Sequence, residues 1–108
     1  MPQPLFSIIV PCCNVGKYIA PLAQSIRNQQ FTDYEVLLVV ENSTDDTLEQ
    51  CQRAAGNASN WHIFTQPRSG SPATPRNTGL DHATGKYALF VDGDDQLPTS
   101  NFQLPMGR

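Results

Sequence analysis

Four short runs of apolar residues alternate along the chain with stretches in which apolar residues recur every three or four positions. The continuous runs are typical of strands buried on both faces and predict strands at 6–10, 34–40, 61–65 and 87–91. The periodic stretches predict helices at 17–30, 45–55 and 76–83. This alternation predicts an α/β fold, with a mostly parallel sheet of about four strands and flanking helices.

Prolines and capping residues indicate where the predicted strands and helices begin and end. Pro11 is expected to stop the first strand, and Pro21 to lie near the first turn of the first helix, where a missing N–H costs least. Polar residues 42–44 read as caps, with the acidic pair 45–46 in the first turn of the second helix. Residues 66–75 contain three prolines and read as a loop.

Composition narrows the class of protein. The 108 residues are 39 % hydrophobic and 16 % charged, which suits one domain or part of a larger one. The net charge of −3 argues against a general nucleic-acid binder but allows one phosphorylated ligand. The longest nearly apolar stretch, 5–13, is about half of what a membrane-spanning helix needs, so no membrane segment or signal peptide is expected.

The cysteines fit neither a disulfide framework nor a zinc site. Cys12 and Cys13 are adjacent, and Cys51 stands alone. This spacing predicts reduced thiols and a cytoplasmic location.

Polar segments follow three of the predicted strands, at 11–14, 41–45 and 92–95. The carboxyl ends of parallel strands meet at one edge of a sheet, and ligands bind there near a switch in strand order. We therefore expect these segments to converge on a common site.

The segment at 92–95 contains three carboxylates, which repel one another unless a cation lies between them. Oxygen ligands suit a hard divalent ion, Mg²⁺ or Mn²⁺, and Gly93 allows a tight turn. The alternative is an ordinary solvated turn.

Arg76 and Glu41 each allow a functional and a purely structural interpretation. Arg76 at the predicted start of a helix suits a phosphate, or it is a surface arginine. Glu41 ends an apolar strand, where it can accept a hydrogen bond from a base or ribose or simply begin the next turn. Ser43 and Thr44 read as caps rather than nucleophiles. The chain contains no G-x-S-x-G, P-loop or G-x-G-x-x-G motif, which lowers the hydrolase, NTPase and nicotinamide-enzyme readings.

Taken in order, three blocks resemble the N-terminal part of family 2 glycosyltransferases with the GT-A fold. They are FSIIVPCCNVGKYIAPLAQSIRNQ, YEVLLVVENSTDDT and SGSPATPRNTGLDHATGKYALFVDGDDQL, which together span about Phe6 to Leu97. The resemblance implies that residues 1–97 form the nucleotide-sugar-binding, Rossmann-like half of a GT-A domain. Residues 98–108 are then expected to be a poorly ordered tail at the truncation point of a longer enzyme.

The resemblance also implies roles for individual residues. The family pattern V-P-x-Y-N corresponds to VPCCN here, with Cys13 at the aromatic position, and the acidic residue before G-S-T-D corresponds to Glu41. The family D-x-D corresponds to Asp92-Gly93-Asp94, which implies that Asp92 and Asp94 hold the Mg²⁺ or Mn²⁺ that bridges the donor diphosphate. The implied nucleotide-sugar-binding residues are Pro11, Cys13, Asn14, Glu41, Ser43, Arg76, Asp92 and Gly93.

The implied reaction transfers a sugar from a nucleotide-diphosphate sugar, with UDP the commonest nucleotide in the family, to a hydroxyl of a saccharide or lipid-linked acceptor. Inversion and a role in polysaccharide biosynthesis are expected from the family. No catalytic base is assigned, because Asp95 is the last acidic residue. The 108 residues alone are therefore expected to bind nucleotide weakly and to transfer no sugar, with the acceptor half following Arg108.

Two alternatives stay open on sequence grounds. One is a non-catalytic α/β module in which the acidic segment is only a turn. The other is a nucleotidyltransferase-like domain, although such domains carry a Gly-rich, basic loop after the first strand, which 11–16 matches poorly.

Overall fold

The computed structural model describes residues 4–29 and 33–94, and it folds them into alternating strands and helices. In chain order these are β1 Phe6–Cys12, α1 Gly16–Arg27, β2 Tyr34–Glu41, α2 Thr47–Ala55, β3 Trp61–Gln66, α3 Ala73–His82 and β4 Tyr87–Phe90. The predicted residues Asp95 and 98–108 lie outside the described residues. Within the described part, no helix has the length and apolar character needed to cross a membrane.

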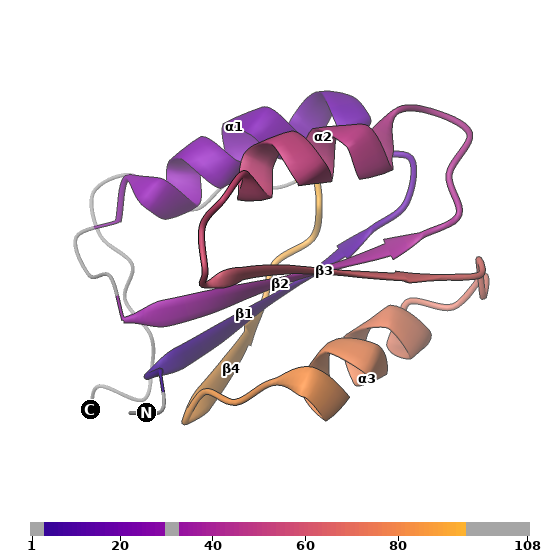
Figure 1. Cartoon of the computed structure of the whole chain (residues 1–108). Coiled ribbons are helices and arrows are strands. Elements are labelled where there is room, and N and C mark those ends of the chain that lie inside the picture. Colours follow the sequence, from indigo (N-terminus) through magenta and orange to yellow (C-terminus); the bar gives the residue numbers. More distant parts are fainter. Residues whose placement is uncertain (1–3, 30–32, 95–108) are drawn as a thin grey trace.

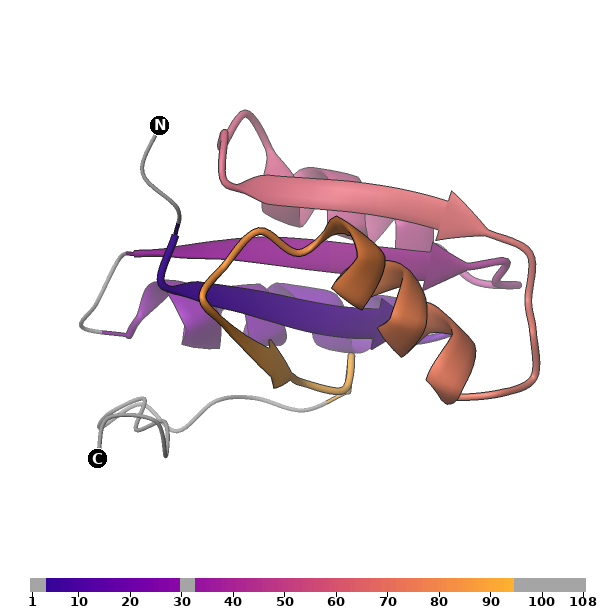
Figure 2. The ribbon, with the colours of Figure 1, turned by 90° about the horizontal axis from the view of Figure 1, so that it is seen from below.

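The four strands form one parallel sheet in the order β3-β2-β1-β4. Helices α1 and α2 lie on one face of the sheet, and α3 lies on the other (Figures 1 and 2). The chain first adds strands outward from β1 and then returns to its opposite side for β4, so the strand order reverses between β1 and β4. The predicted α/β fold is confirmed.

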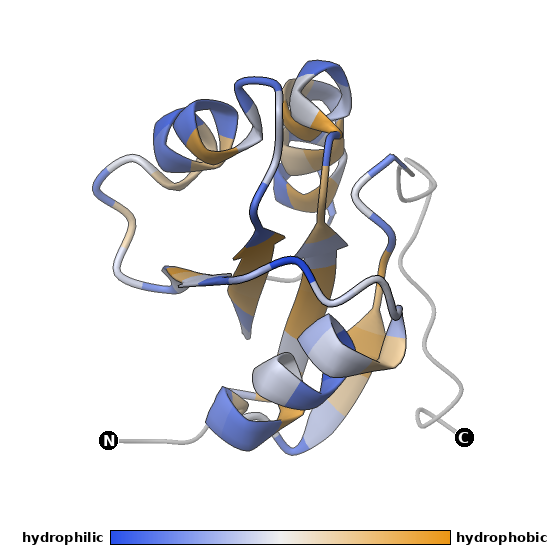
Figure 3. Ribbon diagram, turned by 90° about the vertical axis from the view of Figure 1, so that its right-hand side faces the viewer, coloured by the Kyte–Doolittle hydropathy of each residue, from blue (hydrophilic) through white to orange (hydrophobic). Residues whose placement is uncertain are grey.

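Both faces of the central strands are buried, which explains their continuous apolar runs. On the face toward α1 and α2, Ile8 and Leu38 pack with Ile19, Leu22 and Ile26. Ile9 and its register partner Leu37 are equally buried on the opposite face. Figure 3 shows the apolar strands enclosed between the helices. Burial of this surface is the main source of stability.

The structure corrects the role expected for Pro11, because β1 continues through this residue to Cys12. The Ile9 carbonyl accepts from the Val91 N–H on the β4 side, and the backbone of Pro11 points to the same side two residues later. Paired β4 residues end opposite Ile9, so the missing N–H of Pro11 removes no ladder bond there.

The structure also corrects three helix starts. Helix α1 begins at Gly16, which places Pro21 in its second turn, on an exposed side. Helix α2 begins at Thr47, so the acidic pair 45–46 precedes the helix. Helix α3 begins at Ala73, so Arg76 lies inside the helix and not at its start.

Candidate donor-binding site

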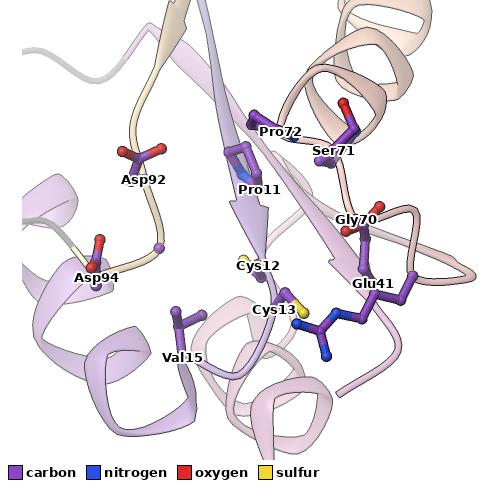
Figure 4. Close-up of a pocket in the computed structure, with 13 residues that line it drawn as sticks. Pro11, Cys12, Cys13, Val15, Glu41, Gly70, Ser71, Pro72, Asp92 and Asp94 are labelled. Atoms are coloured by element: carbon purple, nitrogen blue, oxygen red, sulfur yellow. The ribbon is translucent and has the colours of Figure 1, made fainter.

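The carboxyl ends of β1, β2 and β4 surround one cavity of about 410 Å³. Figure 4 shows Pro11 and Cys13 between Glu41 on one side and Asp92 and Asp94 on the other. The three predicted segments therefore converge at one edge of the sheet, beside the reversal of strand order. The predicted residues that line the cavity are Pro11, Cys13, Glu41, Asp92, Gly93 and Asp94.

Glu41 ends β2 and is buried, with 6 % of its surface exposed. Its Oε2 accepts hydrogen bonds from the Ser69 hydroxyl at 2.7 Å, the Ser69 N–H at 3.3 Å and the Gln66 amide at 3.2 Å. This carboxylate therefore anchors the loop that follows β3. The loop is held against the cavity, and a carboxylate remains at the cavity wall.

That loop supplies residues which sequence reasoning missed. Arg68, Gly70, Ser71 and Pro72 line the cavity together with Glu41. The sequence could have indicated these residues, because they follow the third predicted strand. The carboxyl end of that strand lies at the same edge of a parallel sheet as the ends of the others. Arg68 brings positive charge to a cavity whose described lining also includes the carboxylates of Glu41, Asp92 and Asp94.

The acidic segment turns directly after β4. Asp92 and Asp94 are exposed, whereas Gly93 between them is buried. A Cβ atom at Gly93 would lie 2.8 Å from Val15 Cγ2 and 3.1 Å from the Pro11 carbonyl oxygen. Only glycine allows this close approach, so the two carboxylates are presented on a turn that packs against β1.

Arg76 reaches the cavity edge from α3. Its guanidinium lies 3.4 Å from Asp92 Oδ1 and 5.8 Å from the centre of the Phe90 ring. Its Nε is buried and has no hydrogen-bond partner among residues 4–29 and 33–94. Arg76 does not line the cavity itself, but it places a fixed positive charge beside one of the two carboxylates.

Hydrogen bonds of Asn14 and Ser43 join the segment after β1 to the segment after β2. The Asn14 N–H donates to Ser43 Oγ at 3.0 Å, and the Thr44 N–H donates to Asn14 Oδ1 at 2.8 Å. Neither Asn14 nor Ser43 lines the 410 Å³ cavity, and Ser43 lines a neighbouring hollow with Asp45. Their predicted contacts with a nucleotide stay predictions.

All three cysteines are free, which confirms the expected thiols. Cys12 is buried against Cys51, and the neighbouring thiol together with burial raises the pKa of Cys12 well above its usual value. Cys12 therefore stays a protonated core thiol at neutral pH. Cys13 is partly exposed at the cavity and donates weakly to the Asn42 carbonyl.

The donor set suits a hard divalent cation. Asp92 and Asp94 offer exposed carboxylate oxygens from the turn after β4, and oxygen ligands are the ones Mg²⁺ and Mn²⁺ prefer. Among residues 4–29 and 33–94, no three His, Cys, Asp or Glu side chains form a ready metal site. A cation held by Asp92 and Asp94 would have further positions for oxygens of a bound ligand, as is usual for Mg²⁺ bound with phosphates.

Comparison with known proteins decides the family. Residues 7–104 match the family described as Glycosyl transferase family 2. This chain belongs to that family. The nucleotidyltransferase-like alternative is thereby set aside.

Among curated relatives, poly(ribitol-phosphate) beta-N-acetylglucosaminyltransferase TarS of Staphylococcus aureus is 39 % identical over 94 residues, covering 85 % of this chain and 16 % of TarS. An uncharacterized glycosyltransferase of Haemophilus influenzae is 35 % identical over 103 residues, covering 95 % of this chain and 41 % of that protein. The chain thus spans less than half the length of these relatives.

Solved structures agree in fold. TarS 1–349 in complex with UDP-GlcNAc superimposes with a TM-score of 0.82 at 38 % identity, over 89 % of this chain and 28 % of TarS 1–349. The mannosyltransferase PcManGT from Pyrobaculum calidifontis, in complex with GDP-Man and Mn²⁺, superimposes with a TM-score of 0.80 at 27 % identity. This match covers 91 % of this chain and 30 % of the PcManGT chain. The chain therefore shares the parallel sheet and flanking helices of these GT-A glycosyltransferases.

Proposed function

We propose that this chain binds the nucleotide-diphosphate sugar donor of a glycosyl transfer, with Mg²⁺ or Mn²⁺ held by Asp92 and Asp94. The observation that carries the proposal is the convergence of the β1, β2 and β4 ends on one cavity with both carboxylates at its wall. The complexes of TarS with UDP-GlcNAc and of PcManGT with GDP-Man and Mn²⁺ support this assignment.

In this proposal the charges of the site serve a leaving nucleoside diphosphate. A divalent cation held by Asp92 and Asp94 would supply positive charge beside the diphosphate. Arg76, fixed 3.4 Å from Asp92, adds a second positive charge close to the same place. Both groups act on negative charge that grows during the reaction, which is where electrostatic stabilisation lowers a barrier.

The remaining cavity walls suit the nucleoside. Glu41 has an orientation fixed by Ser69 and Gln66, so it offers a positioned acceptor for a base or ribose. Pro11 and Cys13 provide a small, mostly apolar surface, although Cys13 cannot stack on a base as an aromatic residue would. Transfer with inversion to an acceptor hydroxyl, polysaccharide synthesis and a cytoplasmic location belong to the same proposal.

A titration of the 108-residue chain with UDP, followed by backbone amide shifts with and without Mg²⁺, tests the proposal. We expect metal-dependent shifts at Glu41, Arg68 and Asp92 to Asp94. Asp94→Ala should weaken UDP binding in Mg²⁺ by about tenfold or more, which corresponds to about 1.4 kcal/mol.

The matched control is Asp81→Ala, because Asp81 is an exposed carboxylate of α3 outside the cavity. It should leave UDP affinity unchanged. Parallel titrations with UDP-GlcNAc and GDP-mannose identify the preferred donor. Shifts confined to the opposite edge of the sheet, or no binding of any nucleotide, would refute the proposal and favour the non-catalytic module. Sugar transfer by these 108 residues alone would refute the expected inactivity of the chain.

A further inference from the structure

The segments that follow β1 and β2 are joined by a set of hydrogen bonds that uses most of their polar side chains. Asn14 Oδ1 accepts from the Thr44 N–H at 2.8 Å and from the Thr44 hydroxyl at 3.1 Å. The Asn14 N–H donates to Ser43 Oγ at 3.0 Å, and that hydroxyl donates to the Glu41 carbonyl at 2.9 Å. Asn14 is therefore tied to the second segment through both its side chain and its backbone.

The same segments are joined again at the start of α1. The Val15 N–H donates to Thr47 Oγ1 at 2.9 Å, and the Gly16 N–H donates to Asp45 Oδ2 at 3.0 Å. Val15 caps α1 without a side-chain hydrogen bond of its own, and these two N–H groups of the helix start are satisfied instead by Asp45 and Thr47. We call the side chains of Asn14, Ser43, Asp45 and Thr47 the interloop clamp.

The hydrogen bonds of the clamp that end on Asp45 involve a charged group. The Thr47 hydroxyl and the Gly16 N–H both donate to Asp45 and lower the pKa of its carboxyl. Asp45 is therefore ionised at neutral pH and accepts charge-assisted hydrogen bonds, which are stronger than neutral ones. The Thr47 N–H adds a further bond to Asp45 Oδ1 at 3.0 Å.

Asn14 adopts a backbone conformation that few other residues tolerate. Its φ is 55°, in the left-handed region where asparagine and glycine are favoured. Two residues later, a Cβ at Gly16 would lie 2.2 Å from Asp46 Oδ1 and 3.3 Å from the Asp46 carbonyl carbon, so a larger residue there would displace the Asp46 side chain. The sequence of the first loop thus meets specific geometric demands of the clamp.

The clamp also reaches the acidic turn through one apolar contact. Val15 Cγ2 would lie 2.8 Å from a Cβ at Gly93, and both residues line the cavity. Figure 4 shows Val15 between the end of β1 and the segment that carries Asp92 and Asp94. A continuous set of contacts therefore runs from the clamp through Val15 to the turn between the two carboxylates.

We propose that Asn14 is a positioning residue: through the interloop clamp it holds Val15 against Gly93 and so sets how Asp92 and Asp94 present their carboxylates to a divalent cation. This inference rests on the proposed donor and metal binding. It gives Asn14 and Ser43 a role that needs no contact with the nucleotide. It predicts that changes in the clamp alter the metal-dependent part of nucleotide binding.

The test compares UDP affinity with and without Mn²⁺ in variants of the 108-residue chain, by calorimetric titration. Asn14→Gly keeps the left-handed backbone and removes Oδ1, whereas Asn14→Asp keeps an acceptor at that place. In Asn14→Gly the gain in UDP affinity on adding Mn²⁺ should fall by about tenfold, with little change in metal-free affinity. Asn14→Asp should restore most of that gain.

Two further variants make the test decisive. Val15→Ala keeps every backbone group of the clamp and removes the contact with Gly93, so it should reduce the metal gain even if Asn14→Gly fails to fold. Asn57→Gly is the matched control, because Asn57 is exposed beyond the other end of α2 and lines none of the cavities at the strand ends. It should leave both affinities unchanged.

The outcomes separate this inference from the proposed function. If the unmodified chain shows no metal-dependent UDP binding, the proposed function itself is wrong. If the unmodified chain shows metal-dependent UDP binding, the variants decide the positioning role. That role alone is overturned if Val15→Ala and any folded Asn14→Gly keep the full gain in UDP affinity on adding Mn²⁺. A loss of UDP affinity in Asn14→Gly that is equal with and without Mn²⁺ would instead show that Asn14 contacts the nucleotide, and would also overturn it.

Discussion

Glu35 is a buried charged residue near the start of the apolar strand β2, and its partners explain why it is tolerated there. The Ser7 hydroxyl donates to its Oε2 at 2.6 Å and the Thr84 N–H at 2.7 Å, while His62 Nε2 lies 3.9 Å from Oε1. Burial raises the pKa of Glu35, but the hydrogen bonds from Ser7 and Thr84 outweigh it, so the net pKa is lowered. The carboxylate thus joins β1, β2 and the loop before β4.

Glu35→Gln should destabilise the fold by about 1–2 kcal/mol at neutral pH, because it replaces charge-assisted hydrogen bonds by neutral ones. A lowered folded-state pKa stabilises the fold above the ordinary glutamate pKa, and this stabilisation is lost as pH falls through the lowered value. The difference between the parent chain and Glu35→Gln should therefore shrink in acid.

Urea unfolding at pH 7 and at a pH below about 4 measures this difference. Glu49→Gln is the matched control, because Glu49 is an exposed glutamate that pairs with Arg53 across one helix turn. It should change stability by less than about 0.5 kcal/mol. A destabilisation by Glu35→Gln that is the same at both pH values would contradict the argument.

At the scale of the elements, Arg27 of α1 contacts both α2 and β3. Arg27 in the last turn of α1 donates to the Ala54 carbonyl near the end of α2, and its guanidinium lies 4.3 Å from the centre of the Trp61 ring. A cation at the carboxyl end of a helix is favourable, and so is a guanidinium stacked on an indole. Arg27 therefore stabilises the packing of both helices over the sheet edge.

Arg27→Ala should cost about 1–2 kcal/mol of stability, because it removes the helix-end hydrogen bond and the stacking together. Arg53→Ala is a matched control within the same helix pair, since Arg53 forms an exposed ion pair with Glu49. Its cost should be about 0.3–0.5 kcal/mol and should fall with added salt. Equal costs for the two variants in chemical denaturation would refute the assignment to Arg27.

At the scale of the molecule, the candidate site is assembled from segments that lie far apart along the chain. β1, β2, the loop after β3 and the turn after β4 each contribute one wall of the cavity. β4 forms an edge of the sheet, and Phe90 is 41 % exposed there. A ligand that contacts all four walls therefore binds only the folded chain, and its binding energy adds to the stability of the whole fold.

UDP and Mn²⁺ together should raise the midpoint of thermal unfolding more than the sum of their separate effects. At a concentration about 100-fold above the dissociation constant, the gain should be about 2.7 kcal/mol. EDTA should reverse the metal-dependent part, and Asp92→Asn combined with Asp94→Asn should abolish it, whereas Asp81→Asn should not. Additive effects of UDP and Mn²⁺ would indicate separate sites and contradict the shared one.

Local patterns in the sequence were sufficient to predict the elements and much of the site. Apolar runs and helical spacing depend on neighbours within a few residues, so the strands, helices and parallel sheet could be inferred without coordinates. The meeting of the segments after β1, β2 and β4 followed from topology alone, because parallel strands share one carboxyl edge. Boundary errors at Pro11 and Arg76 arose where a neighbouring segment decides the end of an element.

Only the tertiary structure decided what each polar side chain does within that site. Glu41 holds the loop after β3, Arg76 pairs with Asp92, and Asn14 is bonded to Thr44, and each partner lies many positions away along the chain. A hydrogen bond depends on the distance and direction between two groups, and no local pattern of residue types specifies these for distant segments. The sequence therefore determined which side chains reach the sheet edge, and packing determined which of them remain available to a ligand.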